Sequence, residues 1–114
     1  MEDRDYLRHI ERAIREIQEH TAGLTLESYE SDSKTQRAVE RNLQIVGDAV
    51  HKVSAAFMRS NPDIEWEQIY AARNVVVHFY FGVNNKIVWD ILQEDLPPLL
   101  AKVEALLAGE REAE

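Results

Sequence analysis

Cysteine is absent from this 114-residue sequence, which excludes disulfides, thiolate metal sites and a cysteine nucleophile. The first five residues are acidic and lack the apolar core of a secretory signal. No apolar run approaches the length of a membrane span. Low-complexity segments and internal repeats are also missing. These absences predict a cytoplasmic protein with no membrane segment.

Positive charge is the minority sign. The chain has 13 lysines and arginines against 21 aspartates and glutamates, for a net charge of −8. A protein that coats nucleic acid without sequence preference is usually basic, so the balance argues mildly against that class. An acidic chain can still act on RNA where its positive charge is local, and its acidity suits docking to a basic partner.

The overall composition is ordinary for a folded protein, with 45% hydrophobic and 30% charged residues. The length predicts one domain, placed at residues 1–108, and a frayed tail at 109–114. Four segments carry the three-four spacing of an amphipathic helix, and none reads as a strand. Short connections between them favour an all-α, up-down four-helix bundle.

The four helices can be placed from their apolar positions. The first is expected at residues 3–20, and the second follows a stripe that runs from Val39 to Phe57. Asn61 is expected to cap the third helix, with Pro62 at its first position and a break at Gly82. The fourth is expected at residues 86–108, kinked or restarted at Pro97-Pro98 because prolines remove two backbone donors.

The third helix contains the stretch with the most chemistry, Arg73-Asn74-Val75-Val76-Val77-His78-Phe79-Tyr80. Each residue of an ideal helix advances about 100°. With Arg73 at zero, Tyr80 falls at about −20°. Asn74 then falls at about 100° and His78 at about 140°. The four polar residues share one side of the helix, and Val75, Val76 and Phe79 project to the other.

These residue types suit metal-free chemistry on a phosphodiester. Arg73 offers a fixed fork of donors for a phosphate and for the charge of a pentavalent transition state. His78 can move a proton to or from a ribose 2′-hydroxyl, and Asn74 can orient His78 or the substrate. Tyr80 can donate to a phosphate, stack on a base or accept a modification. A bland alternative stays open, in which Arg73 forms a salt bridge while His78 and Tyr80 pack at a bundle edge.

Beyond this motif, three further stretches match one family in register. They are Ala38–Ala49, Tyr80–Val83, and Ile87–Leu92 with Asp95-Leu96-Pro97; Trp66 lies upstream of the motif. Together with the R-X4-H-X-Y pattern from Arg73 to Tyr80, they make the chain resemble the HepT-like (DUF86) toxins of the HEPN superfamily. The resemblance covers residues from about 3 to about 107, and Phe79 stands where many relatives have glycine.

The resemblance implies a helical, homodimeric, metal-independent endoribonuclease that acts as a toxin on RNA, such as tRNA. It makes Arg73 and His78 the catalytic pair with Asn74 assisting, and it needs no cofactor. It further implies an MNT-type nucleotidyltransferase antitoxin that transfers AMP to Tyr80. Some HEPN proteins are inactive, so the alternative is a non-catalytic module that binds and assists a nucleotidyltransferase.

The sequence also supports predictions for Asp48, for the other histidines and for the two tryptophans. Asp48 on the second helix resembles the family's acidic residue, and it either orients Arg73 or His78 or is simply solvated. The three other histidines, His9, His20 and His51, show no metal-ligand spacing and are expected at the surface. Trp66 and Trp89 are expected in the core or at a dimer interface.

Overall fold

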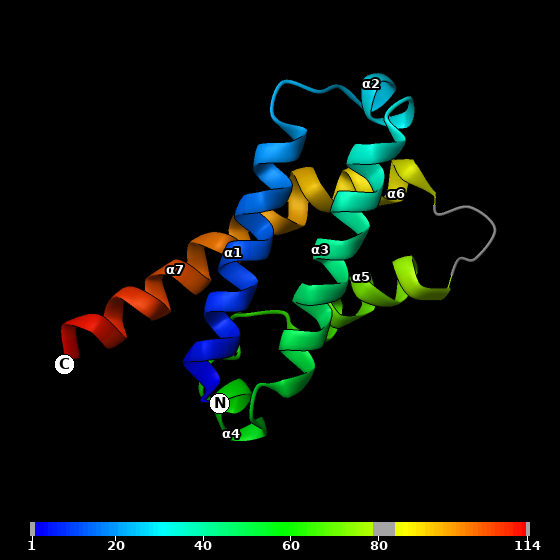
Figure 1. The fold of residues 1–114 in the computed structure, drawn as a ribbon. Coiled ribbons are helices and arrows are strands. Elements are labelled where there is room, and N and C mark those ends of the chain that lie inside the picture. The colour runs from blue at the N-terminus through cyan, green and yellow to red at the C-terminus, as the bar shows by residue number, and fades with distance from the viewer. Residues whose placement is uncertain (1, 79–83, 114) are drawn as a thin grey trace.

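The computed structural model describes residues 2–78 and 84–113, and those residues form helices joined by short turns and no strand (Figure 1). The long helices are α1 (Asp3–Thr21), α3 (Ser33–Lys52), α5 (Trp66–His78) and α7 (Leu96–Ala113). The shorter ones are α2 (Leu26–Glu30), α4 (Ala55–Ser60), α6 (Asn85–Asp90) and the π-helix η1 (Ile91–Asp95). The predicted all-α fold, a HEPN-like helical bundle, is confirmed.

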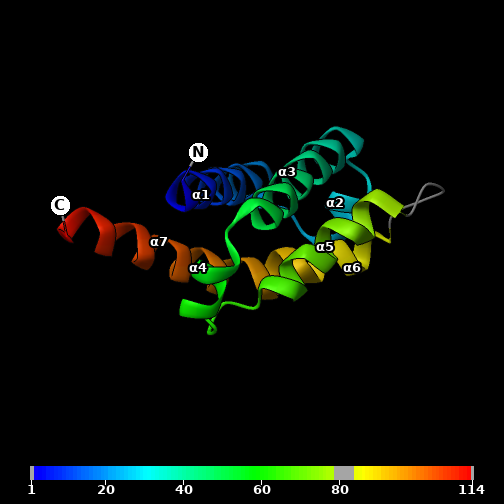
Figure 2. The same ribbon diagram turned by 90° about the horizontal axis from the view of Figure 1, so that it is seen from below.

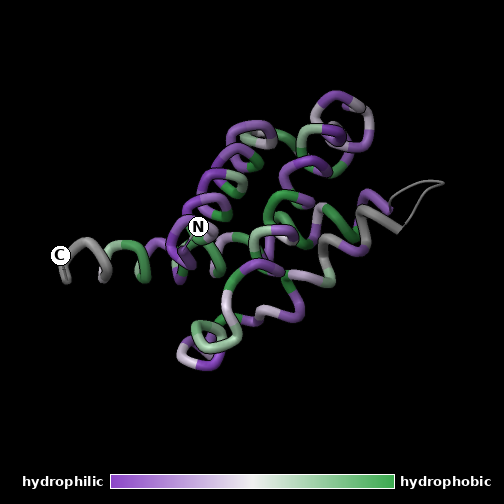
Figure 3. Tube along the Cα trace, turned by 60° about the horizontal axis from the view of Figure 1, so that its bottom comes forward, coloured by the Kyte–Doolittle hydropathy of each residue, from purple (hydrophilic) through white to green (hydrophobic). Residues whose placement is uncertain are grey.

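The two longest N-terminal helices, α1 and α3, form an antiparallel pair that supplies one layer of the core (Figure 1). Their buried faces repeat at three-four spacing, as the sequence predicts, and Figure 3 shows hydrophobic and hydrophilic residues alternating within the turns of both helices. The buried aliphatic residues are Leu7, Ile10, Ile14 and Ile17 from α1, and Val39, Leu43, Val46 and Val50 from α3. Burial of such side chains is the main force that joins the helices.

The C-terminal part of the chain crosses this pair from one side of the molecule to the other (Figures 1 and 2). α7 packs against α1, while α5 lies beside α3 and runs in roughly the opposite direction (Figure 2). The helix α3 therefore has α1 on one side and α5 on another. The packing of α5 against α3 therefore positions the residues of α5.

The connection from α3 to α5 departs from the sequence prediction in two ways. The apolar stripe predicted through Phe57 is interrupted, because α3 ends at Lys52 and Ser54 caps the separate helix α4. The Ser54 side-chain oxygen accepts a hydrogen bond from the Phe57 amide at 3.1 Å. The Ser54 amide and hydroxyl both donate to the Asp3 carboxylate, at 2.8 and 2.7 Å. Asp3 thus ties the start of α1 to the start of α4.

The predicted start of the third helix at Asn61 and Pro62 is wrong. Asn61 ends α4, where its side-chain amide donates to the Phe57 carbonyl at 3.0 Å. Its own carbonyl accepts from the Trp66 indole N–H at 3.1 Å. Trp66, only 8% exposed, is the first residue of α5 and holds the preceding turn against the core. The prediction failed because Asn and Pro also favour helix ends and turns.

The C-terminal segment restarts where the prolines predicted a break. The π-helix η1 separates α6 from α7, and Pro97 and Pro98 occupy the second and third positions of α7. A missing backbone donor costs little in the first turn of a helix. Trp89 of α6 packs against the buried Tyr29 with ring centroids 5.3 Å apart, so both tryptophans contact the core as predicted. Within the described residues, no helix is long and apolar enough to cross a membrane.

Candidate functional site

The sequence motif lies on α5. The backbone of Arg73, Asn74 and His78 is helical, as predicted, and His78 follows Arg73 by five positions, a rise of about 7.5 Å along the axis. The side chains of Arg73 and His78 lie outside the described part of the structure. Phe79 and Tyr80 lie outside the described residues altogether. The roles predicted for these residues therefore stay predictions.

The described residues next to the motif form a seam between α3 and α5. The His51 ring of α3 stacks on the Tyr70 ring of α5, with centroids 5.4 Å apart and planes inclined by 27°. Asn74 follows Tyr70 by one turn and is half-buried, while Asp48 precedes His51 by about one turn and is exposed. We call these four residues the α3–α5 seam.

The opposite directions of the two helices determine what the seam brings together. A step from His51 back to Asp48 and a step from Tyr70 on to Asn74 run the same way in space, because α3 and α5 are roughly antiparallel (Figure 2). Asp48 of α3 therefore lies on the same side of the His51–Tyr70 contact as Asn74 of α5. The seam places the Asp48 carboxylate and the His51 imidazole of α3 beside α5, the helix that carries Arg73 and His78.

Sequence reasoning placed His51 at the surface and assigned it no partner. It is exposed, but one face of its ring is covered by Tyr70. No spacing rule could have found this contact, because the two residues belong to different helices. The His51–Tyr70 contact depends on the turn between α3 and α4, because the path of the chain after α3 sets where α5 packs.

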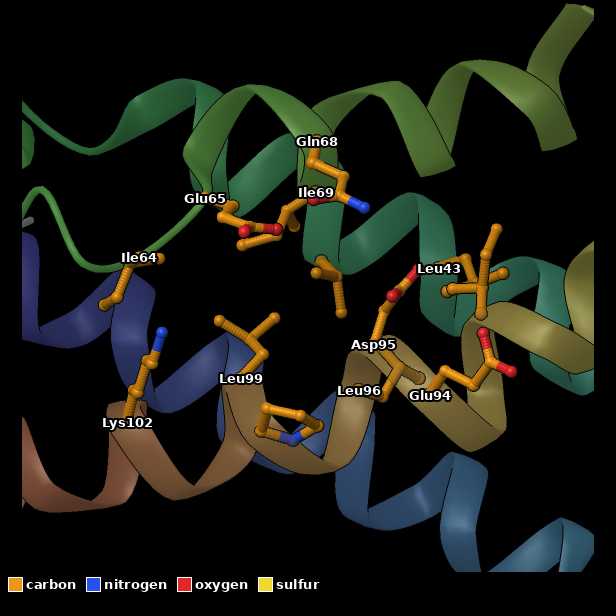
Figure 4. A pocket seen from close by; sticks show the side chains of 13 residues that line it. Leu43, Ile64, Glu65, Gln68, Ile69, Glu94, Asp95, Leu96, Leu99 and Lys102 are labelled. Carbon is orange, nitrogen blue, oxygen red and sulfur yellow. The ribbon is translucent and has the colours of Figure 1, made fainter.

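A cavity of about 220 Å³ lies on another side of α5 (Figure 4). Its walls come from the start of α5, from η1 and from the first turns of α7, and two residues of α3 contribute to its lining. The apolar lining residues are Leu43, Val46, Ile64, Ile69, Ile91, Leu96, Pro98 and Leu99. The polar ones are Glu65, Gln68, Glu94, Asp95 and Lys102. Sequence analysis did not predict this cavity.

One carboxyl of the cavity is electrostatically strained. Burial and, to a smaller degree, the neighbouring charge of Glu65 raise the pKa of Asp95 above the usual aspartate value. Figure 4 shows the Asp95 side chain extending from η1 toward α5. Among the described residues, no three or more histidine, aspartate or glutamate side chains gather as metal ligands.

Comparison with known proteins identifies the family. The family model described as "Ribonuclease HepT-like" matches residues 10–106, and this range includes both the motif of α5 and the seam. The chain is 39% identical over 103 residues to "Probable ribonuclease HepT" of Thermococcus cleftensis, an alignment that covers 90% of this chain and 94% of the relative.

Two further relatives align over similar lengths. A "Putative RNase" of Caldanaerobacter subterraneus subsp. tengcongensis is 32% identical over 108 residues, covering 95% of this chain and 96% of that protein. Another "Putative RNase", from Methanocaldococcus jannaschii, is 31% identical over 104 residues, covering 91% and 86%. No solved structure matches the chain. The motif, the helical fold and these alignments agree, and the chain belongs to the HepT-like ribonuclease family.

Proposed function

We propose that this protein is a metal-independent endoribonuclease toxin of a HepT/MNT toxin–antitoxin system of the type VII kind. The observation that carries the proposal is the Arg73-X4-His78-X-Tyr80 pattern in a chain that the HepT-like family model matches from residue 10 to 106. The ribonuclease names of the relatives support RNA as the substrate.

The proposed reaction uses the RNA's own 2′-hydroxyl. His78 takes the proton of that hydroxyl, and O2′ attacks the adjacent phosphorus. The bond from phosphorus to O5′ breaks, and the leaving O5′ takes up a proton. One product ends in a 2′,3′-cyclic phosphate and the other in a 5′-hydroxyl. Arg73 binds the phosphate and stabilises the negative charge of the transition state, and Asn74 orients His78 or the substrate.

The seam adds a carboxylate to this scheme. Asp48 lies on α3, the helix that packs beside the motif helix α5. This position favours a role for its carboxylate in orienting Arg73 or His78. Through such a role a carboxylate would act on the reaction without touching the RNA. The homodimer expected for the family would bring two motif helices to one RNA cleft, and light scattering of the purified protein measures the predicted mass.

The test of the catalytic assignment is the substitution His78→Ala. We expect complete loss of RNA cleavage and of growth arrest, because no other group in the scheme removes the 2′ proton. Cleavage by the unchanged protein should persist in excess EDTA and should leave cyclic-phosphate ends. His20→Ala is the matched control, since His20 is exposed in the last turn of α1, and it should keep full activity.

Circular dichroism checks that both histidine variants remain folded. Equal toxicity of folded His78→Ala and of the unchanged protein would overturn the assignment. Dependence of cleavage on a divalent cation would overturn the metal-independent part of the proposal.

Neutralisation is proposed to act through Tyr80. Transfer of AMP from a nucleoside triphosphate to its hydroxyl by an MNT-type nucleotidyltransferase, with release of pyrophosphate, would add bulk and negative charge seven residues along the chain from Arg73 and would oppose phosphate entry. Intact mass spectrometry after co-expression with that enzyme should show AMP additions, which Tyr80→Phe should abolish. Additions that persist in Tyr80→Phe would place the acceptor elsewhere.

The second candidate is a non-catalytic module that binds a nucleotidyltransferase and assists it. The net charge of −8 favours it, because an acidic chain suits protein docking better than RNA binding. This candidate predicts stable co-purification with the enzyme and no RNA cleavage in its absence. Cleavage by the isolated protein excludes it.

A further inference from the structure

The cavity between α5, η1 and α7 has an apolar lining and an acidic opening (Figure 4). Leucine, isoleucine, valine and proline side chains make the walls. Glu65, Glu94 and Asp95 contribute carboxylates, and each of these three residues is exposed. An apolar pocket with a few polar groups at its edge is the usual form of a binding site.

The three carboxylates have no neutralising partner among the described residues. No salt bridge joins Glu65, Glu94 or Asp95 to a described cation. Lys102 also lines the cavity and keeps its positive charge, although its amine donates a hydrogen bond to the Asp63 backbone carbonyl and so holds the turn before α5. Among the described residues that line this opening, three carboxylates therefore stand against one cation.

We propose that this cavity docks a segment of a partner protein that carries an apolar side chain between basic residues. The apolar side chain would fill the cavity, and its flanking lysines or arginines would face Glu65, Glu94 and Asp95. The net charge of −8 would speed the encounter with a basic partner. The pKa of Asp95, raised by burial and by Glu65, should fall once a cation neutralises that pair of charges.

Charge also decides against two other occupants. RNA would bring its phosphates against three carboxylates, which opposes binding at this opening. A second copy of this chain that met this opening with its own would set three carboxylates against three more. A basic protein segment is the occupant whose charge complements the site.

The described lining of the cavity shares no residue with the α3–α5 seam. From α5 the cavity takes Gln68 and Ile69, whereas the seam takes Tyr70 and Asn74. Binding there can therefore be tested by physical measurements that involve no RNA, and its failure would leave the ribonuclease proposal intact.

The experiment uses the full chain and an amidated peptide in which leucine and tryptophan are flanked on each side by two lysines. Fluorescence anisotropy measures its affinity, and methyl NMR maps its contacts. Two peptides serve as probe controls, one with glutamates replacing the lysines and one with serines replacing the apolar pair. We expect the lysine peptide to shift the methyl signals of Leu43, Val46 and Leu99, and both control peptides to bind weakly.

The decisive variant is Glu65→Gln with Glu94→Gln and Asp95→Asn, which replaces exposed residues and so keeps the core. We expect it to weaken the lysine peptide about tenfold, equivalent to ~1.4 kcal/mol. The matched control is Glu16→Gln with Glu19→Gln and Glu30→Gln, which removes the same charge from exposed positions on α1 and α2. Its affinity should change less than twofold.

Three outcomes would overturn the proposal. Equal weakening by the two triple variants would mean that only net charge attracts the peptide. Equal binding of the serine peptide would mean that the cavity takes no side chain. Displacement of the lysine peptide by RNA from the cavity methyl groups, or by self-association of the chain, would assign this surface to a different occupant.

Discussion

At the scale of single residues, the buried Tyr29 combines an apolar ring with an unsatisfied polar group. It is fully buried against Trp89, and its hydroxyl has no hydrogen-bond partner among the described residues. Burial, together with the charge of Glu40, raises the pKa of Tyr29 to about 12. An unpaired buried hydroxyl loses its hydration and gains nothing in return, so the ring alone accounts for the stabilising effect of this residue.

Tyr29→Phe should therefore raise the free energy of unfolding by up to about 1 kcal/mol at neutral pH, measured by urea denaturation. The gain should grow in alkali. The folded-state pKa lies above the unfolded one, so the native protein loses stability as pH rises from the ordinary value of 10.0 toward about 12, and the variant cannot. Tyr6→Phe, at a half-buried position, is the comparison. A loss of stability in Tyr29→Phe would mean that the hydroxyl has a partner.

At the scale of elements, helix ends show which predictions succeed. Apolar spacing predicted α1 and the body of α3 closely, because burial of one face dictates both. The short helices α2 and α4 escaped prediction because each is defined by a capping side chain rather than by a long stripe. Thr25 caps α2 and Ser54 caps α4, and both are residue types that also occur in ordinary turns.

The start of α3 offers a test of such a cap. The Asp32 carboxylate accepts from the Thr35 hydroxyl at 2.6 Å and from the Thr35 amide at 3.1 Å, and these bonds, the hydroxyl first, lower the pKa of Asp32. Because the folded-state pKa is depressed, the stabilisation is present above the unfolded-state pKa and is lost as pH falls through the folded one. Asp32→Ala should lower the midpoint of thermal unfolding at pH 7, with a deficit that shrinks below about pH 4.

Asp32→Asn separates charge from geometry in this experiment, since asparagine also caps helices well. It should stay close to the unchanged protein at pH 7. A deficit of Asp32→Ala that is the same at every pH would show that the carboxylate charge contributes nothing to the cap.

At the scale of the whole molecule, α5 has two differently equipped sides. On one side, the seam with α3 holds His51 and Tyr70 next to the motif helix. On another, the cavity with η1 and α7 presents three carboxylates. The acidity that argues against RNA binding in the composition is thus concentrated in part at an opening whose described lining shares no residue with the seam. Composition averages over surfaces that the fold keeps apart.

The sequence sufficed for the fold class and for the helix that carries the motif, because both follow from periodicity along one segment. It could not reveal the His51–Tyr70 contact or the cavity. Each depends on how separate helices meet, and that depends on the turns at Ser54 and Asn61, whose short polar side chains allow several local structures. The family resemblance assigned roles to the motif residues, but it assigned none to the residues that line the cavity between η1 and α5.

The π-helix η1 has a consequence for the register of the last third of the chain. A π turn holds one residue more than an α turn, so everything after it is rotated by about 100° relative to an uninterrupted helix. Leu99 and Leu100 face the core with that rotation included. An uninterrupted α-helix over the same residues would turn these leucines away from the core, whereas deletion of one residue from Ile91–Asp95 would remove the π turn and leave their register unchanged. The wider π turn accommodates the extra residue, so that α6 and α7 bury their apolar faces at the same time.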